Sequence, residues 1–467
     1  MGGVGRIARA IRCAERVGGV VLPAVRRWKW LLFGAALVIC GQGTFMRSLE
    51  DAKRNYSHVR ASDWEQTNVW LRSSECARDT GAWLALCGDD GRLIAISEEA
   101  LGDDPGHALL LDLWSIMSGR VATLVDVAHL NIALNTAGFV VLASFLFAIR
   151  GYICAGVFLY LGPTVYLKWI GVSPHWGLLG VASLAAVLPM ALVARELRYL
   201  SSRQASTFVA LGLIGLALAS LVREAIGLMG TVTALAVLVS IMVRRRRREG
   251  REGGHPLRLA LAILLASTAP YVAITARDVA FDMEPGQRIG RHGFADILYM
   301  GLGAVPNGFG ITYDDNVALA HARDVDPAVV HCSPSFFKIM WKLYLNAVLN
   351  EPSEVARIYF EKARLILADP ILEPGPPLGV LLLLGLGHFV AATALGLWRR
   401  VHFLPGALVE AAALIFIGLF VAQAILATPA RGYAMPAGAA VLALVGVLFG
   451  FFSRAVWALA KARLAKL

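Results

Sequence analysis

Two adjacent carboxylates and a histidine mark the first place in this chain where chemistry is expected. They lie in residues 102–107, where Asp103 and Asp104 are followed by a Pro-Gly pair and then by His107. A carboxylate can act as a general base or bind a divalent cation. The structural alternative is a turn in which an aspartate caps the helix expected over residues 108–117.

Arginine supplies a second kind of chemistry, because its guanidinium can grip a phosphate with two parallel hydrogen bonds. Arg431 and Tyr433 lie in a short polar stretch, residues 428–436, between two late apolar runs. Arg223 lies with Glu224 between two earlier apolar runs. The alternative for Arg223 is a solvated charge pair in a tight turn.

A third polar cluster comprises Tyr313, Asp314 and Asp315. Together with His107, these residues are candidates for contacts with a second substrate. The alternative for Asp314 and Asp315 is a structural turn.

The composition is that of a membrane protein. The chain has 467 residues, of which 57% are hydrophobic and 16% charged, whereas soluble proteins carry about a quarter charged residues. The net charge of +11 follows from basic residues that flank apolar runs, a topology signal rather than a nucleic-acid footprint. The sequence contains no phosphate-binding loop, dinucleotide fingerprint, nucleophile elbow or His/Cys metal spacing.

The apolar runs predict an all-α polytopic fold with about ten transmembrane helices. A basic tail, residues 1–29, precedes a first span, residues 30–46, and a basic tail, residues 454–467, closes the chain. Spans two to seven are expected within residues 130–276 and spans eight to ten within residues 376–453. Both termini are therefore expected in the cytoplasm.

Two polar segments, residues 47–129 and 277–375, are expected outside the cytoplasm. The first carries the acidic pair and a helix on the membrane surface; the second is expected to be a small, mostly helical domain. Cys76 and Cys87 share the first segment. An oxidising compartment would favour a disulfide between them, and a reducing one would leave two free thiols.

This combination resembles the GT-C superfamily of integral membrane glycosyltransferases. In that superfamily an acidic motif in the first external loop precedes a membrane-surface helix, which is the place of Asp103 and Asp104. Arg431, Tyr433 and Pro436 are similar to an arginine-tyrosine-proline pattern at the start of a late span, although Gly432 separates the first two. Because many members carry the acids directly after the first span, Glu50 and Asp51 are rival candidates.

The resemblance implies an inverting enzyme in a bacterial inner membrane, with its active site facing the periplasm. It would transfer a sugar from a polyprenyl-phosphate donor to a glycan, lipid or protein acceptor. Asp104 or Asp103 would be the catalytic carboxylate, and Arg431, Tyr433 and Arg223 would bind the donor phosphate. A divalent cation is the one candidate cofactor. The alternatives are an O-antigen ligase or polymerase, with Arg288, Arg291 and His292 as its signature, and a lipid or solute transporter.

Overall fold

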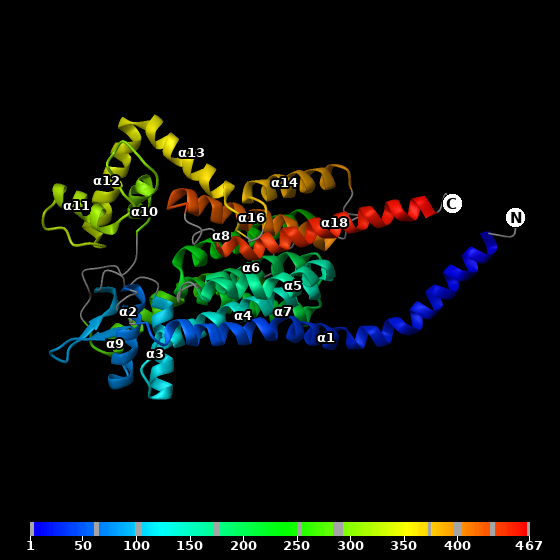
Figure 1. The fold of residues 1–467 in the computed structure, drawn as a ribbon, viewed down its shortest axis with the longest axis horizontal. Helices are drawn as coiled ribbons and strands as arrows, with labels where there is room; N and C mark the ends of the chain where they lie inside the picture. The colour runs from blue at the N-terminus through cyan, green and yellow to red at the C-terminus, as the bar shows by residue number, and fades with distance from the viewer. Residues whose placement is uncertain are drawn as a thin grey trace.

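The computed structural model describes residues 4–59, 65–98, 105–171, 178–249, 255–283, 293–371, 375–396, 404–429 and 435–464. Within these ranges the chain is almost entirely helical, with one two-stranded antiparallel sheet, β1 Ala85–Cys87 and β2 Leu93–Ala95. Figure 1 shows a bundle of long helices with both termini at one end and two smaller units at the other. Because these units lie beyond the ends of the long apolar helices, they are called the first and second extramembrane units.

Seven helices of the described chain are long and apolar enough to cross a membrane. They are parts of α1 Val4–Tyr56, α4 Leu124–Ala148, α6 Leu178–Glu196, α7 Ser202–Val222, α8 Glu224–Glu249, α9 His255–Ala280 and α16 Leu404–Leu426. Shorter apolar helices join them: α5 Tyr152–Leu167, α14 Leu378–Ala394 and part of α18 Gly438–Leu464. The chain is therefore a helical integral membrane protein.

Helix α6 lies in the interior of the bundle, where it packs against α4, α7 and α8. Small residues permit the close approach: a Cβ on Gly138 would lie 2.3 Å from the carbonyl oxygen of Gly180. A single polar side chain ties three helices there. The amide of Asn135 accepts a hydrogen bond from the Gly180 N–H and donates one to the Tyr166 carbonyl, each at 2.7 Å.

The first extramembrane unit contains α2 Glu65–Thr80, the β1–β2 hairpin, the short helix η2 Ile96–Glu98 and α3 Pro105–Ser118. The disulfide Cys76–Cys87 joins α2 to β1, so the pairing expected from the sequence is present. One expectation needs correction. Residues 47–56 are not part of a loop, because α1 continues to Tyr56, whose hydroxyl donates to the Ile170 carbonyl at 2.7 Å. That carbonyl lies in η3 Lys168–Gly171.

The second unit is built mainly of helices. It comprises α10 Phe294–Gly301, η4 Leu302–Ala304, α11 Asp315–Val325, α12 Pro334–Asn350 and α13 Pro352–Ala368. Its own apolar core includes Tyr299, Leu302, Phe336, Met340 and Ile358. In Figure 1, α13 runs from this domain to the bundle, where it packs against α16.

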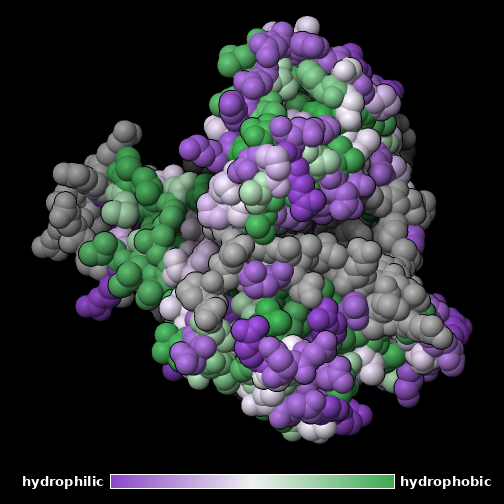
Figure 2. Space-filling model, turned by 90° about the vertical axis from the view of Figure 1, so that its left-hand side faces the viewer, coloured by the Kyte–Doolittle hydropathy of each residue, from purple (hydrophilic) through white to green (hydrophobic). Residues whose placement is uncertain are grey.

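Figure 2 shows the molecule end-on, from the end that carries these two units. Hydrophilic residues cover much of both the upper and the lower part of the described surface there.

Candidate functional site at the end of the bundle

Helix α3 runs across the end of the bundle (Figure 1), as expected of a helix at a membrane surface. Its buried face includes Asp112 and Ser115 and packs against α2. Leu113, Ile116 and Met117 are exposed on the other side, with Met117 80% exposed. An exposed apolar face opposite a polar, buried face suits a helix that rests on the bilayer with one face and packs against a folded unit with the other.

Asp112 anchors that folded unit. Its Oδ2 accepts hydrogen bonds from Ser73 Oγ at 2.9 Å and from the Leu84 N–H at 2.7 Å. Burial raises the pKa of the Asp112 carboxyl to about 7, against the opposing effect of those two donors. The Leu84 carbonyl in turn accepts from Arg277 Nη1 at 2.6 Å, so α3, the hairpin and α9 meet at one residue.

His107 lies inside this end of the protein rather than on its surface. It is 1% exposed, its Nε2 lies 2.8 Å from Asn131 Oδ1 of α4, and its ring stacks on Trp70 at a centroid distance of 4.5 Å. This arrangement positions the start of α3 and favours a positioning role over direct contact with a substrate.

Gly106 brings the start of α3 against the end of α7. A Cβ at this position would lie 2.5 Å from the Leu221 carbonyl carbon and 2.6 Å from the Val222 nitrogen, so only glycine permits the contact. Arg223 follows directly as the C-terminal cap of α7 and is half-buried. Asp103 and Asp104, which precede α3, lie outside the described residues.

Arg431 and Tyr433 also lie outside the described residues. The structure does describe the chain on either side of them. The preceding helix, α16, ends against Lys362 of α13, whose ammonium donates to the carbonyls of Leu426 at 3.1 Å and Ala427 at 2.7 Å. Pro436, which follows, lies in η5 Met435–Ala437.

A small apolar cavity of about 30 Å³ lies between four helices of the bundle, with Pro436 in its lining. It is lined by residues of α4, α6, α16 and α18, among them Leu146, Met190, Phe416 and Ala440. Ser183 is its one hydroxyl-bearing lining residue. At this volume the cavity has room for a few water-sized groups and not for a hydrocarbon chain.

Four other candidate residues from the sequence analysis lie in the described part of the chain, and their contacts are structural or exposed. The side chain of Asp314 accepts from the Asn316 N–H at 2.8 Å and caps α11, which is the structural alternative. Tyr313 packs against the core of the helical domain. Glu50 is exposed on α1, and Asp51 forms an exposed ion pair with Arg54 at 2.5 Å.

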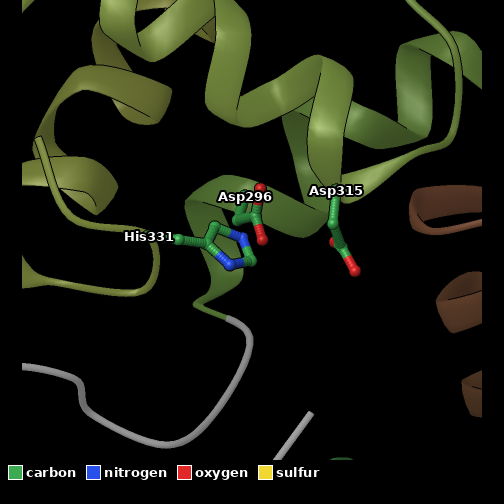
Figure 3. A group of neighbouring side chains, drawn as sticks. All are labelled: Asp296, Asp315 and His331. Atoms are coloured by element: carbon green, nitrogen blue, oxygen red, sulfur yellow. The ribbon is translucent and has the colours of Figure 1, made fainter. Parts of the chain in front are cut away.

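Asp315 has partners that the sequence did not reveal. Its carboxylate lies near the carboxylate of Asp296 and the imidazole of His331. One ligand atom from each of the three residues lies within 4.8 Å of the other two. Figure 3 shows the three side chains near one another on different segments of the domain. The residues come from three separate segments with no ligand-type spacing, so only the tertiary structure brings them together.

No family model, curated protein or solved structure matches this chain. The functional argument therefore depends on the chain's own geometry.

Proposed function

We propose that the protein is an integral membrane glycosyltransferase of GT-C-like architecture. In this proposal the seven long apolar helices and the shorter ones, α5, α14 and α18, make ten spans. The termini lie in the cytoplasm of a bacterial inner-membrane protein, and the two extramembrane units lie in the periplasm. The common placement of both termini opposite both units supports this topology (Figure 1).

The contact of Gly106 with Leu221 and Val222 carries the proposal. It joins the helix that directly follows Asp103 and Asp104 to the turn that bears Arg223. A short length of chain connects the acidic pair to Gly106, since each residue spans at most about 3.6 Å. A carboxylate and a guanidinium at this contact suit an acceptor hydroxyl and a donor phosphate.

The donor in this proposal is lipid-linked, because nucleotide sugars are not available in a periplasm. In the proposed reaction, Asp104 or Asp103 takes the proton from an acceptor hydroxyl, and the oxygen attacks the anomeric carbon. The polyprenyl phosphate leaves with the bonding electrons, held by Arg431, Tyr433 and Arg223. One displacement inverts the anomeric centre.

The test is turnover of purified protein with a panel of polyprenyl-phosphate hexoses and pentoses. Asp104→Asn or Asp103→Asn should fold normally and lose about 100-fold or more in turnover, the scale of a general base. Glu50→Gln and Asp51→Asn are matched controls. Full turnover in both acidic-pair variants, with loss in a control, would move the catalytic acid to α1.

Donor binding has a separate test. Arg431→Ala should weaken binding of a short-chain polyprenyl phosphate, measured by native mass spectrometry, and Arg431→Lys should recover only part of it. Unchanged binding in Arg431→Ala would remove this arginine from the donor site. A protein that moves polyprenyl phosphate between leaflets of a vesicle, with no transfer to any acceptor, would instead be a transporter.

A further inference from the structure

The helical domain contains a cluster of side chains that the proposed transfer reaction does not use. Asp296 is fully buried, His331 is 7% exposed and Asp315 is half-buried. One ligand atom from each lies within 4.8 Å of the other two. Figure 3 shows Asp296 and His331 adjoining, with Asp315 beside them.

Separate local structures position the three residues. Asp296 is in the first turn of α10, and Asp315 is in the first turn of α11, directly after the capping residue Asp314. His331 lies three residues before α12 and two before its capping residue, Ser333. Its ring lies edge-on to Phe336 in the core of the domain, at a centroid distance of 4.9 Å. The backbone therefore holds the cluster independently of any ligand.

We propose that Asp296, Asp315 and His331 bind a divalent transition-metal ion, zinc or manganese. Two carboxylate oxygens and one imidazole nitrogen form a borderline ligand set that suits these ions, whereas magnesium and calcium prefer oxygen ligands alone. A cation at this place would also offset the repulsion of two carboxylates near one another. Three protein ligands leave a coordination position for water.

The geometry requires only a small closure around the ion. Two ligand atoms that each bind an ion at about 2.1 Å can be at most roughly 4.2 Å apart. Rotation of Asp315, the least buried of the three side chains, can supply the difference from the observed limit of 4.8 Å. The ion would then join the starts of α10 and α11 to the segment before α12, a site that does not depend on the proposed glycosyl transfer.

The experiment uses the full chain in detergent, with its affinity tag removed. After treatment with a chelator, the protein is dialysed against zinc or manganese. Bound metal is counted by elemental mass spectrometry, and the melting temperature is measured with and without the ion. We expect about one ion per chain and a rise in melting temperature of roughly 5 °C at saturation. Asp296→Asn and His331→Gln should lose both the stoichiometric ion and the thermal response.

Asp314→Asn is the matched control, because asparagine caps a helix about as well as aspartate and Asp314 is outside the cluster. It should bind metal as the unmodified chain does. If either buried-site variant fails to fold, Asp315→Asn, at the more exposed position, provides the same test. No stoichiometric metal in the unmodified chain, or equal binding in the cluster variants and the control, would overturn the proposal.

Discussion

The ammonium of Lys362 lies 2.7 Å from the carbonyl oxygen of Ala427, just beyond the last turn of α16. It also donates to the Gly301 carbonyl at 2.8 Å, where α10 ends. One fully buried lysine thus joins the ends of a membrane helix and an extramembrane helix. Burial lowers the pKa of its ammonium to about 7, whereas the carbonyls around it favour the charged form.

Replacing Lys362 by methionine should destabilise the protein. The apolar side chain keeps most of the volume but leaves the carbonyls of Gly301, Leu426 and Ala427 without this donor. The free energy of unfolding should fall by about 2–4 kcal/mol, since each buried polar group left without a partner costs about 1–3 kcal/mol. Thermal unfolding in detergent measures it. Lys342→Met, at an exposed position on α12, should leave the melting temperature unchanged.

Gly106→Ala should separate α3 from α7. The added methyl group would meet the backbone of Leu221 at 2.5 Å, and backbone cannot rotate away as a side chain can. Overpacking of this kind costs about 1–3 kcal/mol. The melting temperature and turnover should both fall. In Gly156→Ala, where nothing lies within 4 Å of the new methyl group, both should be retained; equal behaviour of the two variants would contradict the close contact.

Asp112 should make stability depend on pH. Because its pKa is raised from 3.8 to about 7 by burial, the folded state keeps a proton that the unfolded state releases as the pH rises from about 4 to 7. Stability therefore falls over that interval and is level above it. The total loss of unfolding free energy over this interval is a few kcal/mol, because each pKa unit corresponds to about 1.4 kcal/mol.

Asp112→Asn checks this assignment, because asparagine resembles the protonated carboxyl and can still accept from Ser73 and Leu84. The measured quantity is the melting temperature of the variant minus that of the unmodified chain. This difference should rise between pH 4 and 7 and then stay constant. A difference that is the same at pH 4.5 and pH 8 would show that Asp112 does not titrate in this range.

Reduction of the Cys76–Cys87 bond should destabilise the first extramembrane unit. The bond closes a loop with a sequence separation of 11, for which the chain-entropy model gives about 3 kcal/mol. A reductant should lower the melting temperature of the unmodified chain and of Cys40→Ser, which lacks only an exposed free thiol. It should have no effect on the double variant Cys76→Ser/Cys87→Ser. A reductant effect in that variant would have to come from another cause.

The membrane helices were predictable because long apolar runs and their basic flanks are local signals. Even so, the predicted second span began at Leu130, whereas α4 begins at Leu124. The missed signal is a capping box, in which Thr123 Oγ1 and the Asp126 side chain each accept from the other residue's backbone N–H. Hydropathy ignores such caps because they are polar.

Sequence patterns single out candidate site residues only where those residues are neighbours in sequence. Asp103 and Asp104 stand out as a pair, but Asp296 and His331 are 35 positions apart and no local pattern links them. Lys362 likewise has no sequence feature that marks it as buried. Its burial depends on how α13 meets α10 and α16, which no local pattern contains.

The bonds of Asn135 have a consequence for the order of events during synthesis. The partners of its amide lie 31 and 45 residues further along the chain, in α5 and α6. Until both helices have left the ribosome, α4 would carry an amide into lipid without them, at a cost of several kcal/mol. We expect α4 to wait beside the insertion channel and to enter the bilayer with α5 and α6 as one unit.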